Sequence, residues 1–346
     1  MSSRFDRLTP YTPGEQPVDK AYVKLNTNES PFPPSAKAIA AAEEEAKQLQ
    51  LYPDPTCGKL RCALADRYGV TPDRVVVGNG SDEVLSFAFM AYGDKGVAFP
   101  DITYGFYRVF ADLYNLDALE IPLKEDFTID LEQYKGLNRT IFIANPNAPT
   151  GIALTLSQIE ELVVSNPDSV VVVDEAYVDF GGDSAIPLTA KYDNLLVTGT
   201  FSKSRSMAGA RLGFGIGCPA LIQDLETLRY STNPYNVNRM TLAAAIGQLA
   251  DEDTTRRNCQ AVMDNRAYTT EKLEALGFTV IPSRANFVFA SCPQIAGKEL
   301  YLRLKDKGVL VRHFDTPRLT AYNRITIGSR EQMDTLLTAI QSILEE

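Results

Sequence analysis

Seven short apolar runs, separated by helical patterns, restrict the folds that are open to this chain. They comprise residues 75–77, 97–99, 118–121, 140–144, 170–173, 195–197 and 212–216. The runs are continuous rather than alternating, which is typical of strands that are buried on both faces of a sheet covered by helices. The sequence therefore predicts an α/β fold with a mostly parallel, seven-stranded central sheet.

The C-terminal third of the chain shows a different order of elements. Two long helical patterns precede four short strand patterns, at 240–249, 254–276, 279–281, 287–290, 309–312 and 324–327. An amphipathic helix is predicted at 330–344. A chain of 346 residues usually divides into more than one domain. We expect an N-terminal arm (1–34), a large α/β domain (35–238) and a smaller α+β domain (239–346), with the helix at 35–50 packing on the small domain.

Composition and charge argue against several kinds of partner. The chain has 34 Lys and Arg against 44 Asp and Glu, a net charge of −10, and no basic block that would favour nucleic acid or an anionic membrane. Its five cysteines lack C-x-x-C spacing and His313 is the single histidine. A disulfide framework, a metal site and a Ser-His-Asp triad are therefore not expected. Without a signal peptide or a long apolar stretch, we expect a soluble, cytoplasmic protein.

A lysine and an arginine follow the sixth apolar run. Thr200, Ser202 and Lys203 come at its end, and Arg211 lies further along the same connection. A lysine amine can form an imine with a carbonyl cofactor, while hydroxyls and a guanidinium can hold a phosphate. Taken alone, Lys203 has a second interpretation as a solvated surface lysine.

An aspartate ends the fifth apolar run. At that position an unpaired charge on Asp174 would be costly, so we expect a cationic partner. A protonated pyridine nitrogen would fit, and a structural ion pair is the alternative. Tyr177, three residues later, is placed to reach a hydroxyl of the same ring.

Three other strand ends carry candidate ligand contacts. Gly80, Ser81 and Asp82 open a helix whose free N–H groups can cradle an anion, although such turns are also common as tight connections. Tyr104 either stacks on a flat ring or packs as an ordinary aromatic. Asn147 lies in a proline-containing loop in which asparagines can orient polar ligand atoms.

The order and spacing of these residues resemble the fold-type-I pyridoxal-phosphate aminotransferases over nearly the whole chain. Within that superfamily, four segments are similar to those of histidinol-phosphate aminotransferases. They are LTPYTPG (8–14), KLNTNESPFPPS (24–35), YPDP (52–55) and YNVN (235–238).

The resemblance implies pyridoxal 5′-phosphate as the cofactor and a role for each residue. Lys203 would be the Schiff-base lysine, Asp174 the partner of the pyridine nitrogen, Tyr104 the stacking ring and Tyr177 the partner of the phenolic oxygen. The implied phosphate contacts are Gly80, Ser81, Asp82 (through its backbone N–H), Thr200, Ser202 and Arg211. The implied substrate contacts are Arg324, Arg312, Tyr11 and Asn26. Tyr52 is expected to reach the phosphate held by the other subunit of a homodimer.

One position departs from the family pattern. In most relatives the residue before Pro-Thr-Gly is an asparagine that orients the cofactor's phenolic oxygen, whereas this chain has Ala148. Either Asn147 takes over this contact, or Tyr177 makes it alone. We predict Asn147 as a cofactor contact.

The resemblance implies transamination between histidinol phosphate and 2-oxoglutarate, giving imidazole acetol phosphate and glutamate in histidine biosynthesis. Two alternatives use the same scaffold: an aromatic amino-acid aminotransferase and a threonine-phosphate decarboxylase. A transcriptional regulator with an aminotransferase-like domain is a third, but it needs a DNA-binding module, for which the short arm without a basic helix leaves no room.

Overall fold

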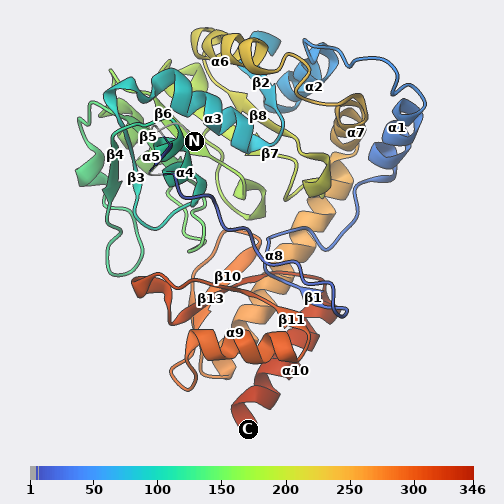
Figure 1. Cartoon of the computed structure of the whole chain (residues 1–346), viewed down its shortest axis with the longest axis vertical. Coiled ribbons are helices and arrows are strands. Elements are labelled where there is room, and N and C mark those ends of the chain that lie inside the picture. The colour runs from blue at the N-terminus through green and yellow to red at the C-terminus, as the bar shows by residue number, and fades with distance from the viewer. Residues whose placement is uncertain (1–4, 7) are drawn as a thin grey trace.

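The computed structural model describes residues 5, 6 and 8–346. In Figure 1 the larger part, above, holds the central sheet between helices, and the smaller part, below, holds short strands beside α9 (Gly297–Asp306) and α10 (Arg330–Glu345). The long helix α8 (Glu252–Ala275) runs from one part to the other. None of the helices in the described part of the chain has the length and apolar content of a membrane-spanning segment.

The central sheet has seven strands, as predicted. In spatial order they are β2 (Val75–Gly78), β8 (Gly213–Ile216), β7 (Leu195–Thr200), β6 (Val171–Asp174), β5 (Thr140–Ala144), β3 (Val97–Pro100) and β4 (Ala118–Ile121). β8 alone runs antiparallel to the other six strands of this sheet. Antiparallel neighbours need no crossover helix, so the connection between β7 and β8 is free to fold back over the sheet edge, and it carries Lys203 and Arg211.

Both faces of this sheet are covered, which explains the continuous apolar runs. Val171 and Val173 belong to one core cluster and Val172 to another, because successive residues of a strand point to opposite faces. One face packs against α2 (Gly58–Tyr68), α5 (Leu156–Val164) and α7 (Arg239–Leu249). The other packs against α3 (Ser81–Tyr92), α4 (Phe106–Leu113) and α6 (Pro219–Thr232).

The smaller part contains a four-stranded antiparallel sheet and a short parallel pair. The sheet comprises β12 (Arg312–His313), β13 (Tyr322–Thr326), β10 (Phe287–Ser291) and β9 (Thr279–Ile281), in that order. The strand predicted at 309–312 is divided between β12 and β11 (Val309–Leu310). β11 pairs with β1 (Val23–Lys24), a strand inside the predicted N-terminal arm. The blue N-terminal segment in Figure 1 thus crosses from the larger part to the smaller one.

The first long helix packs on α7, which the predicted boundaries assign to the small domain. α1 (Ala36–Ala46) begins after the N-cap Ser35, whose side chain accepts a hydrogen bond from the backbone N–H of Ala38. Ala38 and Leu242 of α7 belong to the same core as the central sheet. The structure therefore places α1 and α7 beside the large sheet rather than beside the small one, because their buried apolar residues belong to the core of the large sheet.

Candidate active site

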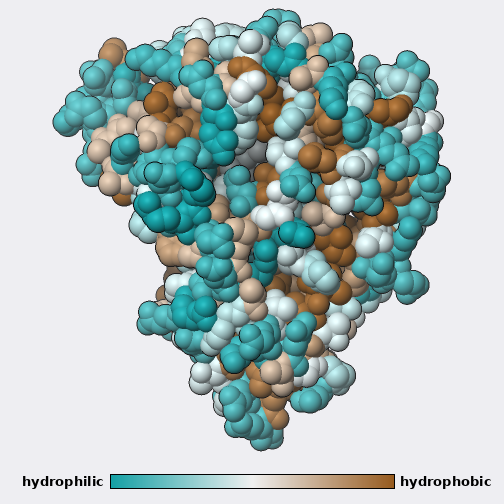
Figure 2. Space-filling model, turned by 180° about the vertical axis from the view of Figure 1, so that it is seen from behind, coloured by the Kyte–Doolittle hydropathy of each residue, from teal (hydrophilic) through white to brown (hydrophobic). Residues whose placement is uncertain are grey.

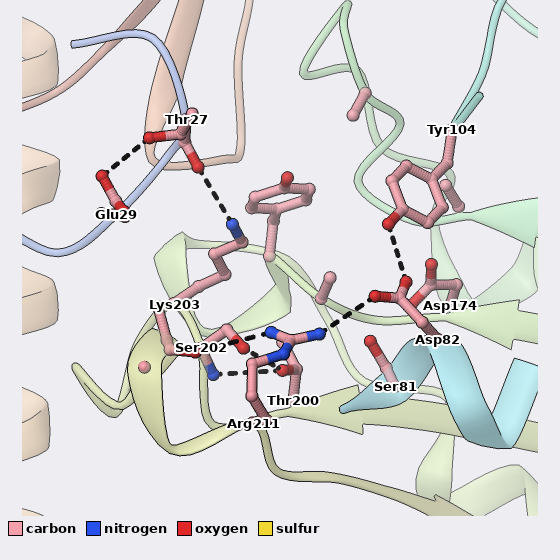
Figure 3. Close-up of a pocket in the computed structure, with 16 residues that line it drawn as sticks. Thr27, Glu29, Ser81, Asp82, Tyr104, Asp174, Thr200, Ser202, Lys203 and Arg211 are labelled. Atoms are coloured by element: carbon pink, nitrogen blue, oxygen red, sulfur yellow. Dashed lines mark hydrogen bonds and ion pairs between the residues drawn. The ribbon is translucent and has the colours of Figure 1, made fainter. Parts of the chain in front are cut away.

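A cavity of about 320 Å³ lies at the carboxyl ends of the parallel strands of the large sheet, where ligands bind in open α/β sheets. The structure brings together there most of the residues predicted as cofactor contacts (Figure 3). They are Ser81, Asp82, Tyr104, Asp174, Tyr177, Thr200, Ser202, Lys203 and Arg211.

Lys203 projects into this cavity from the connection after β7. Its Nζ donates a hydrogen bond to the backbone carbonyl of Thr27 at 3.2 Å and lies 5.8 Å from the centroid of the Tyr177 ring. Burial, followed by the positive charge of Arg324, lowers the pKa of Lys203 to about 8. This amine therefore becomes neutral and nucleophilic at a lower pH than an ordinary lysine does.

Asp174 ends the central strand β6 with a side chain that is only 4% exposed. Its two oxygens accept hydrogen bonds from the hydroxyls of Thr198, at 3.1 Å, and Tyr107, at 3.2 Å. Burial raises the pKa of Asp174 to about 6, although the Thr198 hydrogen bond opposes this shift. Since the described residues supply two hydroxyl donors and no cation, the carboxylate is suited to a cationic group bound in the cavity.

The amino end of α3 forms one wall of the cavity. Gly80 precedes it with a φ of 80°, and a Cβ at Gly80 would lie 2.6 Å from Nη2 of Arg211. A Cβ at Gly213 would lie 2.1 Å from the backbone nitrogen of Ser81. Glycine at both positions thus allows β8, Arg211 and the first turn of α3 to converge. The free N–H groups of this turn and the guanidinium together suit an anion such as phosphate.

Two side chains that were expected at the phosphate also bind each other. Asp82 accepts a hydrogen bond from the Tyr104 hydroxyl at 2.7 Å and pairs with Nη2 of Arg211 at 3.2 Å. The hydroxyl of Thr200 donates to that of Ser202 at 2.9 Å. The Asp82 carboxylate therefore sets the directions of the Tyr104 ring and the Arg211 guanidinium, as Figure 3 shows.

A second chamber, of about 450 Å³, adjoins the first and shares with it Thr27, Tyr104, Ala148, Tyr177 and Lys203. All four predicted substrate contacts line it: Tyr11, Asn26, Arg312 and Arg324.

Two guanidinium groups lie in this chamber without a carboxylate partner among the described residues. Arg324 donates to the backbone carbonyl of Asn26 at 3.0 Å, its Nε has no partner within the described part of the chain, and burial lowers its pKa. Arg312 donates to the carbonyls of Thr12 and Pro13. Unpaired guanidinium groups beside a chamber favour the binding of an anionic ligand.

Three predicted cofactor contacts, Gly80, Asn147 and Tyr52, do not line the cavity of their own chain. The Asn147 amide donates to the carbonyl of Ile102 at 3.0 Å and accepts from the Thr103 hydroxyl at 2.8 Å. It is thereby held within its loop, and the methyl group of Ala148 faces the cavity instead. The prediction of Asn147 as a cofactor contact is not supported, because the loop backbone directs the neighbouring residue inward. Tyr52 is 79% exposed and its ring stacks on that of Tyr235, with the centroids 4.6 Å apart.

The structure adds residues that the sequence analysis missed. Thr198 and Tyr107 bind Asp174, and Asn28 donates to the Tyr177 hydroxyl at 3.0 Å. A signal existed for Thr198, which lies two residues before Thr200 on β7 and so shares its face. Nothing in the local pattern singles out Asn28, because its partner is 149 residues away.

Comparisons with known proteins find similarity to aminotransferases over almost the whole chain. The family model "Aminotransferase class I and II" matches residues 20–340. The histidinol-phosphate aminotransferase of Brachyspira hyodysenteriae is 48% identical and covers 100% of this chain and 99% of that protein. The corresponding protein of a Marinomonas species is 50% identical and covers 97% of each chain. A crystal structure of histidinol-phosphate aminotransferase from Sinorhizobium meliloti in complex with pyridoxal-5′-phosphate superposes with a TM-score of 0.87, at 25% identity, covering 94% of this chain and 92% of that one.

Proposed function

Because the chain belongs to the family of class I and II aminotransferases, we propose that it transfers an amino group between histidinol phosphate and 2-oxoglutarate with pyridoxal 5′-phosphate as cofactor. The reaction gives imidazole acetol phosphate and glutamate and belongs to histidine biosynthesis. We place it in the cytosol, where thiols such as the five free cysteines stay reduced. The observation that carries this proposal is that Lys203 lines both the anion-binding cavity and the chamber with two unpaired guanidinium groups.

The residues of the first cavity fit this cofactor. The buried Asp174 carboxylate, which lacks a cation among the described residues, matches a protonated ring nitrogen. The first turn of α3, Arg211 and the hydroxyls of Thr200 and Ser202 match the phosphate. When bound, the cofactor supplies an electron sink for the carbon that loses its proton.

The side chains of this chain supply the proton transfers and the orientation. The Lys203 amine, with its pKa lowered to about 8, would take the proton from the amino-bearing carbon of the substrate and pass it to the bound cofactor, and it would reverse this transfer in the opposite half-reaction. Asp174 keeps the ring nitrogen protonated. Arg324 and Arg312 orient the substrate by its anionic end, and a guanidinium fork accepts either the phosphate of histidinol phosphate or the carboxylate of 2-oxoglutarate.

We further propose that two copies of the chain form a homodimer in which Tyr52 contacts the phosphate site of the partner. Tyr52 lies outside the cavity of its own chain and is largely exposed. Nearby, an apolar groove of about 490 Å³ runs between α1, α2 and α7 and is lined by Leu60, Leu242 and Ile246. Figure 2 shows tan and brown residues among teal ones on the lobe around α1, and the apolar groove there favours contact with another protein surface.

Subunit mixing tests the shared site. The variants Lys203→Ala and Tyr52→Ala are each expected to have low activity, but mixing them under subunit exchange should raise it. In a mixed dimer one site combines the native Lys203 of one chain with the native Tyr52 of the other. A mixture of Lys203→Ala with wild type serves as the control and should show dilution only. Activity equal to the mean of the separate variants would rule out a shared site.

Initial rates on a substrate panel test the reaction itself. The value of kcat/KM with histidinol phosphate and 2-oxoglutarate is expected to exceed that with aromatic amino acids and phenylpyruvate by at least about tenfold, since unpaired guanidinium groups favour a strongly anionic end. Phosphothreonine should release no carbon dioxide. A higher kcat/KM with phenylpyruvate would identify an aromatic aminotransferase, and carbon dioxide release a decarboxylase.

A further inference from the structure

The side-chain amide of Asn28 lies against the hydroxyl of Tyr177. Asn28 is only 1% exposed, and its Nδ2 donates a hydrogen bond to the tyrosine oxygen at 3.0 Å. Its backbone adopts the left-handed region with a φ of 56°, a conformation that asparagine tolerates better than most residues. Asn28 also lines the second chamber, which holds the predicted substrate contacts. The hydrogen bond between Asn28 and Tyr177 therefore lies between that chamber and the first cavity.

The orientation of the Asn28 amide is fixed by Thr326. The backbone N–H of Asn28 donates to the Thr326 hydroxyl at 3.0 Å. The hydroxyl proton of Thr326 is donated in turn to Oδ1 of Asn28 at 2.9 Å. Since Oδ1 accepts this bond, the end of the amide that faces Tyr177 is the NH2 group. The side-chain amide of Asn286 donates a hydrogen bond to the backbone carbonyl of Asn28 at 3.0 Å. This bond fixes the backbone of Asn28 as well.

This orientation determines where the Tyr177 proton can point. The tyrosine oxygen accepts the amide N–H, so its own proton is available to a different acceptor. Burial raises the pKa of Tyr177, which keeps that proton on the oxygen. The ring is held edge-on by Phe287, with centroids 5.1 Å apart and an interplanar angle of 89°. Tyr177 is therefore a fixed, neutral donor on the wall of the cavity that contains Lys203.

The loop between β5 and α5 provides no substitute for this amide. Ala148 packs with Phe287 and Tyr177 and contributes only a methyl group. The Asn147 amide is bound to Ile102 and Thr103. Asn28 thus contributes an amide that contacts Tyr177, whereas Asn147 was predicted to contact the phenolic oxygen itself.

We propose that Asn28 is the positioning residue that holds the Tyr177 hydroxyl as a donor toward the phenolic oxygen of the bound cofactor. This inference rests on the proposed function, because it requires pyridoxal 5′-phosphate in the cavity. Its expected effect is on cofactor affinity and on the pH at which the lysine-bound cofactor changes its visible absorbance. A donor stabilises an anionic oxygen, so loss of the donor moves that pH upward.

A double-mutant cycle between Asn28 and Tyr177 tests the proposal. Asn28→Gly keeps the left-handed backbone accessible and removes the amide. It is expected to weaken cofactor binding about 3- to 10-fold, as for one lost hydrogen bond, and to raise the absorbance midpoint by about half a pH unit or more. Tyr177→Phe should raise the midpoint at least as much. In the Tyr177→Phe background, Asn28→Gly should cause no further change, because Asn28 acts through the missing hydroxyl.

Further variants separate positioning from folding. Thr326→Val preserves the shape of a buried residue but removes the hydroxyl that orients the amide, so it should shift the midpoint in the same direction. Ala148→Asn in the Asn28→Gly background is expected to restore part of the affinity by supplying an amide from the other side. Asn115→Gly, at an exposed asparagine with a φ of 55°, is the matched control and should leave the midpoint unchanged.

Two results would overturn this role for Asn28. One is an additive effect of Asn28→Gly on the midpoint in the Tyr177→Phe background, and the other is an unchanged midpoint in a folded Asn28→Gly protein. Failure of the proposed function would give different results from failure of this role for Asn28. If the wild type binds no pyridoxal 5′-phosphate, or binds it without using histidinol phosphate, then the family reaction is at fault and not the Asn28 contact.

Discussion

Replacing Lys203 with alanine is expected to lower kcat with histidinol phosphate by roughly 10²–10⁴-fold or more. This is the range that a positioned acid–base group contributes, and the variant also loses the amine that binds the cofactor aldehyde. The visible absorbance of the lysine-bound cofactor should disappear. Lys191→Ala, at an exposed lysine outside the cavity, is the matched control and should retain both properties. Persistence of the visible band in Lys203→Ala would contradict the assignment.

The same variant has a predictable effect on apoprotein stability. The pKa of Lys203 falls from 10.5 to about 8 on folding, so between these values the unfolded chain binds more protons than the folded one. The cost of the buried ammonium is therefore present in full below pH 8 and is relieved as the pH rises toward 10.5. Relative to wild type, Lys203→Ala should unfold at higher urea concentration at pH 7, and this advantage should shrink at pH 10.

Replacing Asp174 with asparagine is expected to have opposite effects on function and on apoprotein stability. Loss of one partner of a buried charge pair typically costs 3–5 kcal/mol, so cofactor affinity and kcat/KM should together fall by roughly 10²–10⁴-fold. The apoprotein should be more stable than wild type above pH 6, because the variant no longer carries an unpaired buried carboxylate. Equilibrium dialysis with pyridoxal 5′-phosphate and initial rates measure the first effect, and urea denaturation the second.

The pH window of the stability effect follows from the direction of the shift. Folding raises the pKa of Asp174 from 3.8 to about 6, so in this interval the folded chain retains a proton that the unfolded chain has lost. Wild-type stability then falls as the pH rises through this window, by about 3 kcal/mol in total. The advantage of Asp174→Asn should be largest above pH 6 and vanish below pH 3.8. An Asp174→Asn apoprotein that is less stable than wild type both above pH 6 and below pH 3.8 would favour the structural ion pair instead.

Glu175→Gln is the matched control for this experiment. Glu175 follows Asp174 directly and is also buried, but its carboxylate accepts from the Ser184 hydroxyl and the Ala185 backbone N–H, away from the cofactor cavity. Burial raises the pKa of Glu175 to about 8, so the side chain is mostly protonated at pH 7 and glutamine is close to its native state. Cofactor affinity and kcat/KM should remain within about threefold of wild type.

The sequence alone predicted the central sheet and the position of the proposed site residues at one edge of it. A strand that is buried on both faces must be apolar along its whole length, so β2, β5 and β7 were visible as continuous runs. Polar residues directly after such runs, among them Asp174 and Lys203, lie at the carboxyl edge of the sheet whatever the details of packing. Their common location in one cavity follows from the parallel arrangement of the strands.

Tertiary structure decided the features that have no local pattern. β1 contains two residues and exists because it pairs with β11, far away in the sequence, and two residues carry no periodicity. Which of two neighbouring side chains, Asn147 or Ala148, faces the cavity depends on the loop backbone and on Ile102 and Thr103.

The contact of Asn28 with Tyr177 was likewise not predictable from the sequence. The contacts of Asn28 join residues 149 and 298 positions apart, and hydrogen bonds over such separations are set only when the two parts of the molecule pack together. Local sequence thus placed the groups that we propose to carry the chemistry at the sheet edge, while long-range packing determined which groups orient them.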